Sequence, residues 1–67
     1  MVTLLVNGDN MEFDGEISVS ALLSKLEVVT GAIAVEVNRD IVSKSVYGEH
    51  LLRDGDQIEI VTFVGGG

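Results

Sequence analysis

The residues with the clearest chemical use are the last three, Gly65, Gly66 and Gly67. They have no side-chain functional group, so the reactive group at this end is the α-carboxylate of Gly67. A free α-carboxyl has a pKa of about 3.3–3.7 and is ionised at neutral pH, which makes it a poor electrophile until a reagent such as ATP activates it. Adenylation would give an acyl-adenylate that a sulfur or nitrogen nucleophile could attack. The sequence therefore predicts a carrier whose reacting group is its own end.

Glycine suits such an end because it has no Cβ and can approach an ATP phosphate closely in a narrow channel. Three glycines in a row also lose much backbone entropy on ordering, so we expect a single domain over residues 1–64 followed by a flexible tail over residues 65–67. The four residues beyond Phe63 would reach roughly 13–14 Å when extended. A frayed terminus or a cloning scar is the alternative reading of the glycines.

The last strand, predicted over residues 57–64, leads directly into this tail. Successive side chains of a strand point to opposite faces, so Ile58 and Ile60 should join the core while Val61 and Phe63 lie on the other face. Two large apolar residues there are covered by a neighbouring loop or form a docking patch beside the reactive end.

Other residues offer little chemistry. The single histidine, His50, lies in an irregular acidic stretch, and we expect it to be solvated or partly packed rather than catalytic. We expect Asp54 and Asp56 first of all to form a turn, through local hydrogen bonds to the backbone. A metal site at that turn would need more oxygen ligands than the turn supplies.

The composition of the chain limits its size class and its partners. The chain has 67 residues, 46% of them hydrophobic, no cysteine and a net charge of −7. This predicts one small domain stabilised by packing alone. Nucleic acid and anionic membranes are disfavoured as partners because binding them needs clustered lysine and arginine. No signal peptide or membrane span is visible, so we expect a cytoplasmic protein.

The first half of the chain predicts a β-hairpin and a helix. A strand over residues 2–6 meets the Asn-Gly turn at residues 7–10 and a second strand containing Met11 and Phe13. Ser18 is the predicted N-cap of a helix that has Lys25 in its last turn, and Thr30-Gly31 is expected to end the segment. The apolar stripe of this helix has the spacing i, i+3, i+4 and i+7: Val19, Leu22, Leu23 and Leu26.

The second half predicts more strands. In order, we expect a strand (32–37), a turn (38–40), a short edge strand (41–42), an irregular stretch with a helical turn near Tyr47 (43–52), a turn (54–56) and the last strand. The fold class is therefore α+β, with a mixed sheet of four to five strands packed on one helix.

These features resemble a known family. The strand order, the Asp54-Gly55-Asp56 turn, the stretch 57–64 and the glycine end are similar to those of the β-grasp, ubiquitin-like sulfur carriers. Within that group the chain most resembles the sulfur carriers of thiamine biosynthesis. It departs from them at Ser43, where the family often has proline, and at Tyr47, where it often has tryptophan.

The resemblance implies a carrier cycle rather than an enzyme. An E1-like adenylating enzyme would use ATP and magnesium to activate Gly67, and a cysteine persulfide would convert the carboxylate into a thiocarboxylate. Thiazole synthase would then take the sulfur, and this chain would bind no cofactor itself. The implied docking and tail residues are Val61, Phe63, Val64, Gly65 and Gly66.

Three alternatives stay open. The small subunit of molybdopterin synthase shares the fold and the Gly-Gly end, but such chains often place prolines before the final glycines. This chain has no proline, and its residues 61–64 resemble the thiamine group better. A ubiquitin-like protein modifier would also begin with adenylation but would end on a lysine amine. The third alternative is a binding module with an inert terminus.

Overall fold

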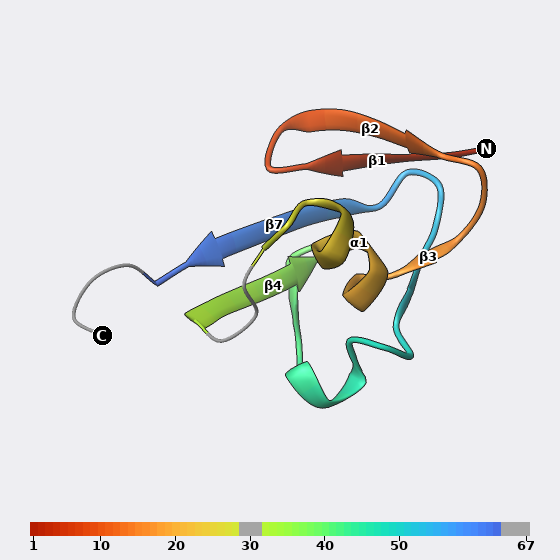
Figure 1. Ribbon diagram of the computed structural model, residues 1–67. Helices are drawn as coiled ribbons and strands as arrows, with labels where there is room; N and C mark the ends of the chain where they lie inside the picture. The colour runs from red at the N-terminus through yellow and green to blue at the C-terminus, as the bar shows by residue number, and fades with distance from the viewer. Residues whose placement is uncertain (29–31, 64–67) are drawn as a thin grey trace.

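In the part of the chain that the structure describes, a mixed five-stranded sheet carries one α-helix on one face (Figure 1). The computed structural model describes residues 1–28 and 32–63, so the predicted end of the helical segment at Thr30-Gly31 lies outside the described residues. The elements are β1 (Val2–Val6), β2 (Asp9–Phe13), β3 (Ile17–Ser18), α1 (Val19–Lys25), β4 (Ile33–Val37), β5 (Asp40–Val42), the 3-10 helix η2 (Lys44–Val46), β6 (Leu51–Leu52) and β7 (Gln57–Thr62). The α+β, β-grasp prediction is confirmed. The short β3–β6 pair, which forms a separate two-stranded sheet, was not predicted.

Strand β7 is the centre of the sheet, whose order is β2-β1-β7-β4-β5. It runs parallel to β1 and antiparallel to β4, and each of these two strands is one arm of a tight hairpin. Both hairpins have two-residue loops in which both residues have positive φ, namely Asn7 (48°), Gly8 (87°), Asn38 (51°) and Arg39 (74°). This is the type I′ geometry that matches the twist of the strands. The predicted Asn-Gly turn and the edge strand at residues 41–42 are confirmed.

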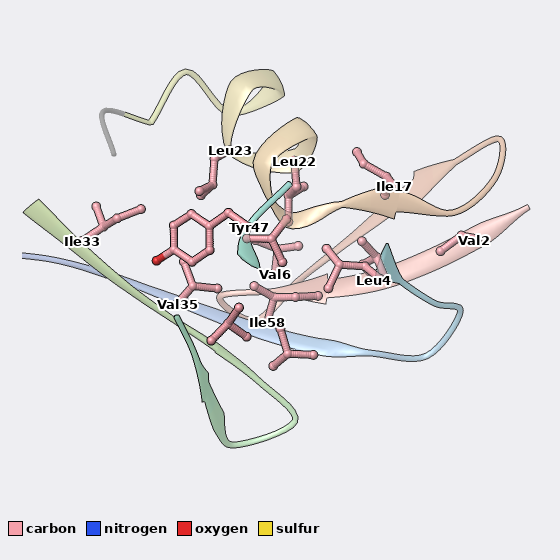
Figure 2. Close-up of a cluster of buried hydrophobic side chains, with 14 residues drawn as sticks. Val2, Leu4, Val6, Ile17, Leu22, Leu23, Ile33, Val35, Tyr47 and Ile58 are labelled. Carbon is pink, nitrogen blue, oxygen red and sulfur yellow. The ribbon is translucent and has the colours of Figure 1, made fainter. Parts of the chain in front are cut away.

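The core lies between the sheet and α1. Its fully buried side chains are Leu4, Val19, Leu22, Leu23, Val35, Leu52 and Ile58. Figure 2 shows Leu22 and Leu23 reaching from the helix toward the sheet, with Tyr47 beside Leu23. Each such side chain contributes about 1.5–3 kcal/mol when fully buried, so packing is the main stabilising term in this small domain.

Helix α1 has only seven residues, too few to be stable alone, and depends on its caps. At its start, Ser18 Oγ accepts a hydrogen bond from the Ala21 N–H at 3.0 Å, which confirms the predicted N-cap. At its end, Glu27 adopts a left-handed φ of 58°, and the Val28 N–H donates to the Leu23 carbonyl at 3.0 Å. This αL closure satisfies carbonyls that the last turn leaves without a partner.

The stretch 43–50 is a second cap for the helix. The N–H of Val19 donates to the carbonyl of His50 at 3.0 Å, and the N–H of Ser20 donates to the carbonyl of Tyr47 at 2.9 Å. Helix N-termini leave their first N–H groups without internal partners, and this loop supplies two of them. The helical turn predicted near Tyr47 is confirmed as η2.

Candidate functional site

The described end of β7 carries exposed apolar side chains on the face of the sheet away from α1. Ile58 is 1% exposed, whereas Val61 is 50% and Phe63 is 61% exposed. The predicted split between the two faces is therefore confirmed, and the covering loop, one of the two alternatives, is not what the structure shows for Val61 and Phe63. Residues 64–67, which include Val64, Gly65, Gly66 and Gly67, lie outside the described residues, so their roles stay predictions.

The neighbouring strands extend this apolar surface. Ala34 of β4 lies opposite Val61 in register, and its small side chain leaves Val61 open. Two residues along β4, Glu36 lies opposite Ile41 of β5, which is 76% exposed on the same face. We call the surface made of Ile41, Ala34, Val61 and Phe63 the outer patch. Ile41 was not predicted to belong to it, because only the β4–β5 pairing brings it there.

Hydrogen bonds hold β7 from both sides at the end near Phe63. On the β4 side, the Phe63 N–H donates to the Ala32 carbonyl at 2.8 Å. On the β1 side, the backbone contact ends where the Asn7 N–H donates to the Ile58 carbonyl at 2.9 Å. The Asn7 side chain continues from there: its Oδ1 accepts from the Ile60 N–H at 2.7 Å and its Nδ2 donates to the Ile60 carbonyl at 3.2 Å.

The turn before β7 fastens its start. Asp56 accepts hydrogen bonds from the Arg53 N–H at 2.9 Å and from Asn38 Nδ2 at 3.0 Å, which confirms that it forms the turn. Asp54 Oδ1 accepts from the Thr3 N–H at 2.7 Å. Asp54 lies in the predicted turn, but this hydrogen bond is to a residue 51 positions away and not to the local backbone as expected, so Asp54 also ties the turn to β1.

The remaining ionisable groups form no catalytic or metal-binding arrangement within residues 1–28 and 32–63. His50 is partly buried and lines a shallow hollow with Asp40, Glu49 and Arg53. No group of three or more metal-ligating side chains gathers in the described chain. Within the same residues, no helix has the length and apolar character needed to cross a membrane. What the described surface offers is a strand end hydrogen-bonded on both sides and an exposed apolar face.

Comparison with known proteins adds an independent finding. The ThiS family matches residues 4–67. The crystal structure of a thiamine biosynthesis protein (ThiS) from Geobacter metallireducens aligns with a TM-score of 0.83 and 33% identity, covering 98% of this chain and 100% of that one. The sulfur carrier protein ThiS of Bacillus subtilis is 37% identical over 65 residues, which are 96% of this chain and 98% of that protein.

A further relative is much longer. A thiazole synthase of Paramagnetospirillum magneticum is 45% identical over 64 residues, which are 96% of this chain but 20% of that protein. The chain thus spans about a fifth of the length of the thiazole synthases that it matches.

Fold and sequence agree. The solved relative has the same arrangement of sheet and helix over nearly all of both chains, and the similarity to the Bacillus subtilis carrier covers nearly all of both chains as well. The prediction of a carrier rather than an enzyme is confirmed by this match to named sulfur carriers. The chain belongs to the ThiS family, the sulfur carriers of thiamine biosynthesis.

Proposed function

We propose that the α-carboxyl group of Gly67 is the reacting group and that an E1-like enzyme adenylates it with ATP and magnesium. One observation carries the proposal: the family match continues through residue 67 and so includes the whole glycine end. The structure supports it with β7, the last strand of the described chain, and with the exposed outer patch at the described end of that strand.

The chemistry that follows is sulfur transfer to an acyl carbon. Adenylation of the carboxylate releases pyrophosphate. The terminal sulfur of a cysteine persulfide then attacks the carbonyl carbon, and AMP leaves with the electron pair of the broken C–O bond. Two equivalents of a thiol then reduce the resulting S–S bond: the first forms a mixed disulfide with the cysteine and releases the thiocarboxylate on Gly67, and the second releases the free cysteine and leaves with the first as a disulfide. The thiocarboxylate is the softer and stronger nucleophile, and no side chain of the carrier acts as acid or base.

Thiazole synthase is the proposed acceptor enzyme. The thiazole synthase of Paramagnetospirillum magneticum contains a segment similar to 96% of this chain. In that protein, a carrier-like sequence and the remaining four-fifths of the polypeptide are synthesised together. Such an arrangement supports a carrier that delivers its sulfur to thiazole synthase.

The outer patch is the proposed docking surface for the adenylating enzyme. Single exposed apolar residues are common, but here Ile41 of β5 shares one face of the sheet with Val61 and Phe63 at the end of β7, and Ala34 of β4, the strand between them, lies on the same face. An aromatic side chain at such a place is the kind of anchor that dominates binding energy. The net charge of −7 favours a basic partner surface around it.

The test is the mass of the protein after reaction. The purified chain is incubated with the adenylating enzyme, ATP, magnesium and a persulfide donor, and its intact mass is measured before and after. We expect a gain matching one oxygen-to-sulfur exchange, located by fragmentation at Gly67. A variant lacking Gly67 is the control and should gain nothing. The starting mass also checks that the protein ends at this residue.

Other outcomes point to the alternatives. A ladder of conjugates on lysines of other proteins would favour a modifier. A thiocarboxylate that supports formation of molybdopterin but not of the thiazole would favour the molybdopterin carrier. An unchanged mass with an adenylating enzyme known to be active would leave an inert binding module.

A further inference from the structure

The two hairpins that flank β7 share a sequence pattern, and in each an asparagine side chain is hydrogen-bonded to the backbone of β7. Residues 6–9 and 37–40 both read Val-Asn-x-Asp, and each asparagine is the first residue of a type I′ loop. Asn7 has a φ of 48° and Asn38 a φ of 51°. In both cases the amide side chain turns toward β7 and forms hydrogen bonds with its backbone.

The two asparagines hold opposite ends of the same strand. Asn38 Oδ1 accepts from the N–H of Gln57, the first residue of β7, at 3.0 Å. Asn7 instead binds both backbone groups of Ile60, three residues before Phe63. The Asn38 bond therefore holds the start of β7, and the two Asn7 bonds hold its later part.

The Asn7 side chain takes the place of hydrogen bonds that β1 would make with β7 if β1 were longer. The parallel pairing of β1 with β7 ends at Val6 and Ile58, because the chain turns back at Asn7 into β2. Figure 1 shows β7 running on past this turn. An amide has the donor and acceptor of a peptide group, so the Asn7 side chain supplies the pair of bonds that the next residues of β1 would have made. Without it, the hydrogen bonds that β7 makes beyond Ile58 with other described residues would all come from the β4 side.

We propose that Asn7 is a positioning residue: its amide fixes the direction of β7 beyond Ile60 and therefore the direction in which the chain runs toward Gly67. The inference rests on the proposed function, because direction matters only if a partner must receive that end. The partner has to contact the outer patch and place the last residue at ATP at the same time. Misplacing a reacting group by about 1 Å can cost about 100-fold in rate.

The test compares two matched variants, Asn7→Gly and Asn38→Gly. Glycine adopts a positive φ without strain, and its effect on the backbone should be alike at the two equivalent loop positions, so a difference between the variants reports the loss of the two different amides. Adenylation is followed as ATP–pyrophosphate exchange with the carrier concentration varied, and stability by urea unfolding. We expect similar losses of stability in both variants. We expect kcat to fall at least about fivefold in Asn7→Gly only, because the patch still docks but the end is misdirected.

A conservative variant and a second measurement test whether the Asn7 hydrogen bonds themselves cause the change in kcat. Asn7→Asp keeps the acceptor for the Ile60 N–H and loses the donor, so it should recover part of kcat. Amide hydrogen exchange of the free carrier should show faster exchange of the Phe63 N–H in Asn7→Gly but not in Asn38→Gly. That N–H donates to Ala32 on the far side of β7, so its exchange reports the strand and not the deleted bond itself.

Equal kcat values for the two glycine variants, or unchanged exchange at Phe63 in both, would overturn the inference and leave Asn7 a structural residue only. If the unmodified chain supports no pyrophosphate exchange with an active partner, the proposed function fails instead. The two failures are therefore distinguishable, because the hydrogen-exchange arm needs no partner.

Discussion

The twin hairpins differ at the second loop residue, and this difference predicts a pair of opposite stability changes. Gly8 has a φ of 87° and Arg39 a φ of 74°. Left-handed backbone costs a non-glycine residue roughly 1–2 kcal/mol, and glycine avoids this cost. We therefore expect Arg39→Gly to stabilise the domain and Gly8→Ala to destabilise it.

The magnitude follows from two opposing terms. A Cβ built on Gly8 meets no atom within 4 Å, so Gly8→Ala adds backbone strain and no clash. Arg39 is exposed and makes no hydrogen bond or ion pair with the described chain, so Arg39→Gly removes strain and no contact. Glycine loosens the unfolded chain by about 0.4–1 kcal/mol, which offsets part of the strain in each case. The net change in unfolding free energy is about 1 kcal/mol, downward for Gly8→Ala and upward for Arg39→Gly.

Urea and thermal unfolding measure these changes directly. For a domain of this size, about 1 kcal/mol corresponds to a shift in Tm of roughly 4–8 °C. The Tm of the double variant should be close to that of the unmodified protein, because the two changes have opposite signs and should add when the two sites are independent. A lower Tm for Arg39→Gly would refute the strain argument and would mean that the Arg39 side chain stabilises the folded state by more than its positive φ destabilises it.

Three further predictions follow. Phe63→Ala should raise the KM for carrier in pyrophosphate exchange at least about tenfold with little change in Tm, because Phe63 is 61% exposed; a large fall in Tm with unchanged KM would make it a core residue instead. Ser18→Ala should lower the unfolding free energy by about 1 kcal/mol in urea, because the Ala21 N–H loses its acceptor, and no loss would mean that the cap is dispensable. Glu36→Gln should raise the unfolding free energy by about 0.2–1 kcal/mol, because Glu36 lies directly opposite Glu59; the gain should shrink in high salt, and a gain independent of salt would argue against charge repulsion.

Local patterns predicted most of the elements. The spacing from Val19 to Leu26 and the Ser18 N-cap give the helix because both depend on residues within two turns of each other. The Asn-Gly turn gives the first hairpin for the same reason. Alternation along residues 57–63 placed Ile58 inside and Phe63 outside, because a strand repeats every two residues whatever its neighbours are.

Contacts between distant residues could not be read in this way. Strands β3 and β6 have two residues each, too few for a pattern, and form only because the chain brings them together. Asp54 looked like a local turn residue but binds Thr3. The backbone of Tyr47 and His50 caps the helix through carbonyl groups, which every residue has and no sequence pattern reveals.

The sequence by itself determined the glycine end, the family resemblance and the alternation that exposes Val61 and Phe63, since these depend on residue type and short-range spacing. Only the tertiary structure placed β7 between β1 and β4, brought Ile41 onto the same face and joined the Asn7 amide to Ile60. The physical reason is that strand order and register are fixed by the shared core and by hydrogen bonds between residues more than fifty positions apart, as between Asn7 and Ile60. The candidate reacting group was therefore predicted from the last residues, while the arrangement of β7 and of the outer patch was decided by the fold.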